Sequence, residues 1–248
     1  MNTIIFPFLL SGLASFSTLI GYLPILLKEK YSSFILPFSL AVSSGVMFSI
    51  SIFSLIPESF VYLEFPSKIF KFLLIFLFMF IGVILVSFFD IFLSNKENNP
   101  IYKLGILSTI SLILHNIPEG ITTYFAAITD KRLGILIALA IALHNIPEGI
   151  SIAVPIYYST QNKLKAFLIT FLAGFSELFG SILTFLFLKN YITNNILSFT
   201  FAITAGIMIY LSIFELLPNS FSYKRKKVTI FGFILGFFLM LLCDFLLH

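Results

Sequence analysis

Eight long apolar stretches, separated by short polar connections, make up most of this 248-residue chain. Each is roughly 20 to 25 residues long, and about 20 helical residues cross the hydrocarbon core of a bilayer. Only 10% of the residues are charged, against about a quarter in soluble domains. We therefore predict an all-α integral membrane protein that forms a single eight-span domain over residues 1–248. The expected spans, placed to within about four residues, are 4–27, 34–56, 72–93, 104–128, 133–157, 166–188, 196–217 and 228–247.

The basic residues indicate which way the chain crosses the membrane, because Lys and Arg accumulate in short cytoplasmic loops. With the N-terminus outside, the inner connections hold ten Lys and Arg residues and the outer ones hold five. We therefore predict that both termini lie outside. The first span lacks the basic leader of a signal peptide and is expected to stay in the mature chain. The net charge of +4 follows from this topology and requires no nucleic-acid partner.

One block of eight residues, LHNIPEGI, occurs twice, at residues 114–121 and 143–150. On a helix, residues three and four apart share a face, so each copy presents a His, an Asn and a Glu together. The Pro in each copy bends its helix, and the Gly allows a second helix to approach closely. Two such helices facing each other would bring these side chains into one mid-membrane pocket: His115, Asn116, Glu119, His144, Asn145 and Glu148.

A second repeat relates the two ends of the chain. Residues 45–60 match residues 206–221 at nine of 16 positions, and residues 13–21 match 172–180 at six of nine. The related spans run in opposite directions across the membrane under the topology above. We therefore predict an inverted repeat that relates spans 1–3 to spans 6–8 and span 4 to span 5. Such repeats place a substrate site near the midplane, at the pseudo-twofold axis.

Six carboxylates fall inside the expected spans, whereas no Lys or Arg falls within the body of any span: the six are Asp90, Glu119, Glu148, Glu177, Glu215 and Asp244. Carboxylates in hydrocarbon need partners, so this asymmetry favours a path for cations. Asp90 and Asp244 lie near span ends, where they are expected to reach the membrane interface. Glu58 and Glu215, also near span ends, are either stations on the cation path or solvated helix-end charges.

The donor types of the doubled block indicate a transition metal. Imidazole with carboxylate suits Zn²⁺, Fe²⁺, Mn²⁺ or Co²⁺, and the absence of Cys from the set argues against a thiolate-dependent Cu(I) carrier. One ion could take both His and both Glu residues. A second could take both Asn residues, with the Glu residues as bridges and Glu177 as an added ligand. Glu177 occupies the repeat position of Thr18, so symmetry did not require a carboxylate there.

These residues resemble the ZIP (Zrt/Irt-like) family of divalent-metal transporters, most closely its bacterial ZupT-type zinc transporters. The resemblance rests on eight spans with outside termini and on HNxPEG in spans 4 and 5, and it covers essentially the whole chain. It implies import of Zn²⁺, with Fe²⁺, Mn²⁺, Co²⁺ or Cd²⁺ often accepted, into the cytoplasm across a bacterial inner membrane. It also implies a binuclear metal site made of His115, Asn116, Glu119, His144, Asn145, Glu148 and Glu177.

One connection departs from that family pattern. Many members carry a long His-rich cytoplasmic loop between spans 3 and 4, whereas residues 94–103 here contain no His. A metal-sensing role of this loop is therefore not expected. Family members are often homodimers, and the sequence itself leaves the oligomeric state open.

Two other functions remain open from the sequence. Intramembrane zinc proteases use H-E-x-x-H, where Glu is adjacent to His, whereas Glu here stands four residues after His. A passive metal channel cannot be separated from a carrier by sequence. The short connections leave no room for a soluble catalytic domain or a phosphate-binding loop. We therefore predict a transporter with no enzyme activity and no cofactor, whose divalent metal is its substrate and whose other partner is the bilayer.

Overall fold

The computed structural model describes residues 5–26, 32–188, 191 and 193–247. Within these residues every regular element is a helix, and eight helices are long and apolar enough to cross a membrane. This confirms the prediction of an all-α protein with eight spans, and the chain is a multi-pass membrane protein. The spans are Ile5–Leu26, Phe34–Tyr62, Lys68–Ser94, Pro100–Thr129, Gly134–Thr160, Lys163–Phe187, Asn194–Ser222 and Lys226–Cys243.

Several spans combine more than one kind of helix. A 3₁₀ segment, η1, continues α1, and π-helical segments η3, η4 and η5 interrupt or end the second, sixth and seventh spans. In chain order the elements are α1 (Ile5–Ser17), η1 (Thr18–Leu26), α2 (Ser32–Ile50), η3 (Ser51–Leu55), α3 (Ile56–Tyr62), α4 (Lys68–Ser94), α5 (Pro100–Thr129), α6 (Lys131–Thr160), α7 (Lys163–Leu183), η4 (Thr184–Leu188), α8 (Asn194–Tyr210), η5 (Leu211–Leu216), α9 (Leu217–Ser222) and α10 (Lys226–Leu247).

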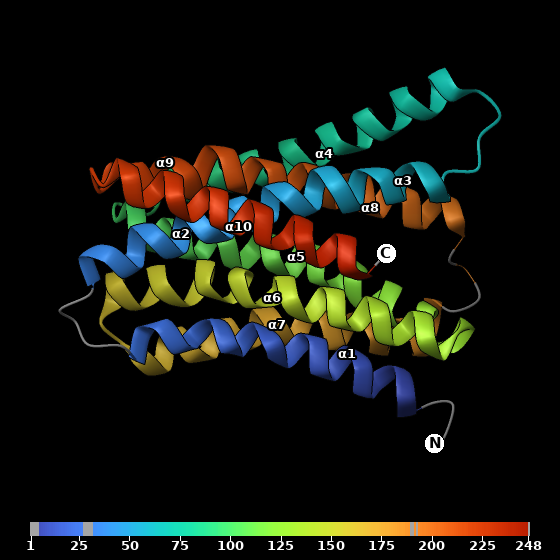
Figure 1. The fold of residues 1–248 in the computed structure, drawn as a ribbon, viewed down its shortest axis with the longest axis horizontal. Helices are drawn as coiled ribbons and strands as arrows, with labels where there is room; N and C mark the ends of the chain where they lie inside the picture. Colours follow the sequence, from blue (N-terminus) through green and yellow to red (C-terminus); the bar gives the residue numbers. More distant parts are fainter. Residues whose placement is uncertain (1–4, 27–31, 189–190, 192, 248) are drawn as a thin grey trace.

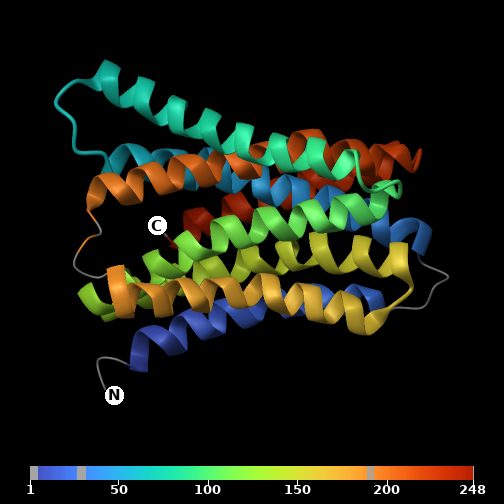
Figure 2. The same cartoon turned by 180° about the vertical axis from the view of Figure 1, so that it is seen from behind.

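The spans run up and down along one long axis, and α1 begins at the same end of the bundle at which α10 ends (Figure 1). This end also holds the turn from α5 to α6 at Thr129, and it is called the Thr129 end below. The opposite end holds the turn from α4 to α5 and is called the Lys103 end. Figure 2 shows the same arrangement from behind. The predicted assignment of the two ends to the two sides of the membrane stays a prediction.

The helices pack as two groups. The site group consists of α1, η1, α5, α6 and α7, in which α1, α5, α6 and α7 all contact one another and η1 packs on α6 and α7. The surrounding group consists of α2, η3, α3, α4, α8, η5, α9 and α10. The groups meet mainly where α2 packs on α6, with smaller contacts from α5 to α4, α8 and η5. The doubled block therefore lies on helices of the site group that also border the surrounding group.

Glycines set the closest helix approaches inside the site group. A Cβ on Gly120 would collide with the backbone carbonyl of Glu177, and a Cβ on Gly149 would collide with that of Thr18. Both contacts follow from small-residue packing, in which a missing side chain lets two helices touch. Because the two Gly residues are copies of one position and Glu177 and Thr18 are repeat mates, these paired contacts support the internal repeat. They also place Glu177 beside the doubled block.

The π-helical segments of the second and seventh spans occupy equivalent positions of the repeat. η3 and η5 both precede a proline, Pro57 and Pro218, which has no amide hydrogen for the regular helix ladder. Such π segments are frequent at functional sites. They carry Ser54 and Glu215, which are repeat mates: Ser54 lines a cavity with His144, whereas Glu215 lies near Lys103.

We predict that Gly149→Ala destabilises the protein, because the added methyl group must displace the Thr18 backbone. Overpacking of this kind costs about 1–3 kcal/mol, so the midpoint of thermal unfolding of the detergent-solubilised protein should fall. Gly12→Ala on α1 is the matched control, since its Cβ would meet no atom within 4 Å. Equal midpoints for the two variants would contradict the packing described here.

Candidate metal site

The two copies of the block lie at the middle of α5 and α6, and they face each other with α7 alongside. All seven predicted ligands are buried: His144 is 6% exposed, Glu119 is 4% exposed, and the other five have no exposed surface. The side chains of His115, Glu148 and Glu177 have no exposed surface, so they cannot be explained as surface charges. The structure thus brings together the residues that the spacing had singled out: His115, Asn116, Glu119, His144, Asn145, Glu148 and Glu177.

The imidazoles and the carboxylates pair across the two helices. His115 Nε2 lies 3.1 Å from Glu148 Oε1 within hydrogen-bonding geometry. His144 Nε2 lies 3.3 Å from Glu119 Oε1, without the alignment of a hydrogen bond. Each block therefore supplies its His to the Glu of the other block. The crossing puts all four side chains at the contact between α5 and α6.

The two Asn side chains are anchored by helices α1 and α7. Asn116 Nδ2 donates to the carbonyl of Ala173 at 3.2 Å, and Asn145 Nδ2 donates to the carbonyl of Ala14 at 2.9 Å. Asn145 Nδ2 also donates to Glu177 Oε2 at 2.8 Å, which fixes that carboxylate at the site. The Oδ1 atoms of both residues have no hydrogen-bond partner among the described residues, so they remain available as acceptors.

Every one of the seven side chains carries a buried polar atom without a side-chain hydrogen-bond partner among the described residues: His115 Nδ1, Asn116 Oδ1, Glu119 Oε1 and Oε2, His144 Nε2, Asn145 Oδ1, Glu148 Oε2 and Glu177 Oε1. Buried polar atoms normally have partners, so such a concentration demands an explanation. Oxygen and imidazole nitrogen are the donors that a divalent metal ion takes. In the described part of the chain, however, no three His, Cys, Asp or Glu side chains are already grouped as a metal cluster. Metal binding would require these side chains to leave their crossed pairs.

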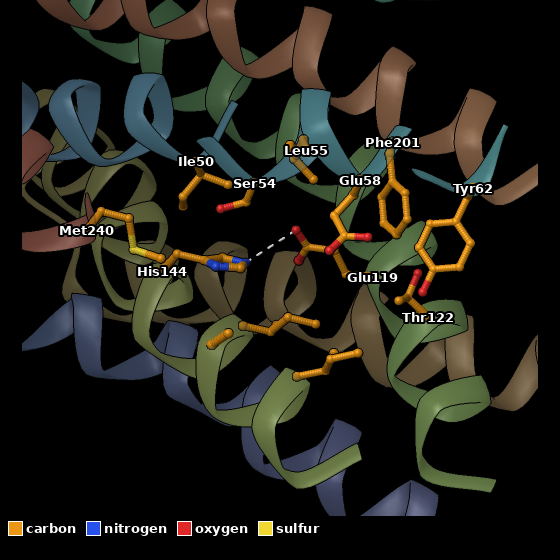
Figure 3. A pocket seen from close by; sticks show the side chains of 13 residues that line it. Ile50, Ser54, Leu55, Glu58, Tyr62, Glu119, Thr122, His144, Phe201 and Met240 are labelled. Carbon is orange, nitrogen blue, oxygen red and sulfur yellow. Dashed lines mark ion pairs between the residues drawn. The ribbon is translucent and has the colours of Figure 1, made fainter. Parts of the chain in front are cut away.

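A cavity leads to one half of this site from the Thr129 end. Figure 3 shows His144 and Glu119 pointing toward each other, with Glu58, Thr122 and Tyr62 on the same cavity. A neighbouring pocket shares Tyr62 and Thr122 with this cavity and extends to Thr129 and Asn194. The lining of the cavity does not include His115, Glu148 or Glu177. In full, it is lined by Ile50, Ser54, Leu55, Glu58, Tyr62, Glu119, Thr122, Ile137, Ala140, Ile141, His144, Phe201 and Met240.

Two sequence expectations about the outlying carboxylates need correction. Asp90 does not simply reach the membrane interface, and Glu215 is not without a cation, because Lys103 forms ion pairs with both. α5 begins at Pro100, earlier than expected, so its first turn carries Lys103 into the bundle. Sequence reasoning had placed Lys103 in a loop. The side chain of Asp244 lies outside the described residues.

The fold and the site together define a class: a multi-pass membrane protein with a buried site of His, Asn and Glu. A family model described as ZIP Zinc transporter matches residues 94–244 of the chain. The chain belongs to the ZIP zinc transporter family. This confirms the resemblance seen in the sequence, and it confirms that the chain belongs with transporters and not with enzymes.

Known relatives are similar over nearly the full length. The chain is 35% identical to the zinc transporter ZupT of Chlorobium phaeovibrioides, with all of both chains covered. It is 34% identical to ZupT of Oceanobacillus iheyensis, with 97% of each chain covered. It is 33% identical to ZupT of Streptococcus mutans, with 94% of each covered. The alignment with the Chlorobium phaeovibrioides relative covers the whole chain, and thus all eight spans and the site.

We predict that Glu119→Gln combined with Glu148→Gln weakens Zn²⁺ binding at least roughly tenfold, because each change removes a charged oxygen donor. Binding to the purified protein is measured by titration calorimetry. Glu64→Gln, at an exposed carboxylate near Asn194, is the control and should bind as the parent does. Binding by the parent should also weaken as the pH falls, since His and Glu must lose protons to bind metal. Unchanged affinity in the double variant would show that the metal binds elsewhere.

Proposed function

We propose that this protein imports Zn²⁺ into the cytoplasm through a binuclear His, Asn and Glu site at mid-membrane, with Fe²⁺, Mn²⁺, Co²⁺ and Cd²⁺ as further candidate substrates. One observation carries the proposal: seven buried side chains, six from the two helices that carry the same block and Glu177 from α7, converge, and each holds a buried polar atom without a side-chain hydrogen-bond partner among the described residues. A membrane protein gains nothing in stability from unpaired acceptors at this depth. Zinc transport by the ZupT relatives supports the same function.

The donor set divides into two half-sites. The first ion would take the imidazoles of His115 and His144 with the carboxylates of Glu119 and Glu148. The second would take the oxygens of both Asn residues, the same two carboxylates as bridges, and Glu177. The hydrogen bond that Asn145 donates to Glu177 supports Glu177 as a ligand of the second ion. This bond holds Glu177 Oε2, and Oε1 has no hydrogen-bond partner among the described residues.

The cavity suggests the direction of entry. With the Thr129 end outside, as the distribution of basic residues predicts, a hydrated ion would pass Tyr62 and Glu58 and meet Glu119 and His144 first. There it would exchange water for protein donors. The His115–Glu148 half and Glu177 would complete the site from behind, because they are buried away from the cavity.

Release to the other side requires a change of shape, since α5 side chains between the site and the Lys103 end, Leu104, Leu107 and Ser111, are buried. The site group and the surrounding group are the natural moving parts, because few helix pairs connect them. Inverted repeats commonly alternate access by moving one bundle against the other around a fixed site. We propose this mechanism here, with the bilayer of a bacterial inner membrane around a chain that acts alone or as a homodimer.

The two alternatives from the sequence are weaker. An intramembrane zinc protease would carry H-E-x-x-H, whereas Glu here stands four residues after His, and the family that the chain matches consists of transporters. A passive channel would need a continuous path, whereas the cavity reaches the site from one end. Saturation of flux with metal concentration separates the carrier from the channel.

We predict that the parent protein in proteoliposomes takes up ⁶⁵Zn²⁺ with saturable kinetics, and that Glu119→Ala with Glu148→Ala reduces uptake to the level of empty vesicles. The physical reason is the loss of both bridging carboxylates. Glu64→Ala serves as the control for a surface carboxylate. Absence of uptake by the parent, or full uptake by the double variant, would refute the proposed function. Competition by Fe²⁺, Mn²⁺, Co²⁺ and Cd²⁺ in the same preparation ranks the substrates.

Glu58→Gln should raise the KM for zinc severalfold and leave the maximal rate nearly unchanged. Glu58 lines the cavity ahead of the site, so its charge concentrates cations there but does not hold the ion during transport. The effect should shrink as ionic strength rises, because salt screens the charge. An unchanged KM at low salt would remove Glu58 from the entry route.

A further inference from the structure

A cluster of polar side chains at the Lys103 end connects the two helix groups. Lys103 Nζ forms an ion pair with Asp90 of α4 and lies 3.7 Å from Glu215 Oε1 of η5. Tyr210 of α8 donates its hydroxyl to Asp90 Oδ2 at 2.8 Å. The side chains of Lys103 and Asp90 are each 17% exposed and that of Glu215 is 10% exposed, so solvent screens these charges weakly.

The cluster crosses the boundary between the groups. Lys103 belongs to α5 of the site group, whereas Asp90, Glu215 and Tyr210 all belong to the surrounding group. Figure 2 shows α4 and α5 meeting at this end of the bundle, where their contact is small. Any movement that separates the groups here must pull one ammonium group away from two carboxylates.

The segment of α5 between this cluster and the metal site is closed. Lys103, Leu107, Ser111 and His115 follow one another at intervals of four residues, so they lie along one face of the helix. Leu107 and Ser111 have no exposed surface. The cluster therefore lies about three turns from His115, along a face of α5 whose intervening side chains, Leu107 and Ser111, are buried.

The sequence repeat gives Lys103 a counterpart on α6, and that counterpart lies in a different environment. Residues 103–107 read KLGIL and residues 132–136 read RLGIL, which extends the match between the two block-bearing helices back to their first turns. Arg132 is therefore the counterpart of Lys103, at the start of α6 and at the Thr129 end. Arg132 is exposed, and the bundle is open to the site from that end. The cation of α5 is thus partly buried and paired with carboxylates at the Lys103 end, whereas its counterpart on α6 is exposed at the Thr129 end.

We propose that Lys103, Asp90 and Glu215 form a releasable latch, the Lys103 latch, which holds the Lys103 end shut while the metal site is open to the Thr129 end. The latch acts without contact to a predicted metal ligand. The ion pairs of Lys103 with Asp90 and Glu215 connect α5 to α4 and η5 until the two helix groups move apart. A cation suits this role because it can also reach water once released. The latch rests on the proposed transport function, in which the two ends open alternately.

The test measures how fast a reagent applied from the Lys103 side reaches the buried face of α5. Ser111→Cys, in a Cys243→Ser background, places the chain's one thiol on the closed face of α5. A membrane-impermeant thiol reagent is applied to reconstituted protein from each side, and the rate of labelling is recorded. Lys103→Gln should raise the rate from the Lys103 side roughly fivefold, the ratio expected for loss of one partly exposed ion-pair network. Lys103→Arg keeps the charge and should label at the parent rate.

Arg132→Gln is the matched control, because it removes one positive charge from the equivalent position of the equivalent helix. It should not raise labelling from the Lys103 side. Asp90→Asn should act like Lys103→Gln, and it serves as the second variant should Lys103→Gln fail to elute as a single folded species. A parent rate in both folded latch variants, or an equal increase in Arg132→Gln, would overturn the proposal. Zinc uptake by the parent protein, without the Ser111→Cys and Cys243→Ser changes, is measured in parallel: no uptake refutes the transport function, whereas the labelling contrast still decides the latch.

Discussion

The structure depends on the crossed contacts between two imidazoles and two carboxylates at the middle of the bundle. A carboxylate is costly in hydrocarbon, so Glu119 and Glu148 can stay at this depth only when other groups face them. Each is faced by the His of the opposite helix, at 3.3 and 3.1 Å. This arrangement requires α5 and α6 to lie against each other. Gly105 and Gly134 allow this, because a Cβ on Gly105 would meet Ile156 of α6 and a Cβ on Gly134 would meet Ala127 of α5.

The rest of the site group keeps these charges in place. The carbonyls of Ala14 and Ala173 hold the two Asn amides, and Asn145 in turn holds Glu177. The bonds come from α1 and α7, which are repeat mates, yet only α7 contributes a carboxylate. The backbone carbonyls that hold the two Asn residues are therefore arranged symmetrically, whereas the carboxylate of Glu177 has no symmetric counterpart. That asymmetry fits a site with two unlike metal positions, as the proposed function requires.

The two ends of the bundle differ although the sequence repeats. Ser54 of η3 and Glu215 of η5 occupy the same position of the repeat. Ser54 lines the cavity that opens to the Thr129 end, whereas Glu215 lies against Lys103. One end offers a route to Glu119 and His144, and the other is held by charge pairs. A carrier that opens to one side at a time needs this kind of difference between its ends.

The sequence by itself determined the eight spans, their helical nature and the predicted ligands, because hydropathy and residue spacing act locally. It did not determine which partner each ligand would have, since spacing within one helix gives no information on contacts between helices. For that reason the crossed His–Glu pairs and the anchoring of Asn145 to Glu177 appear only in the structure. Lys103 is the clearest case: its sequence position indicates a loop charge, and only the packing of α5 against α4 and η5 gives it two carboxylate partners.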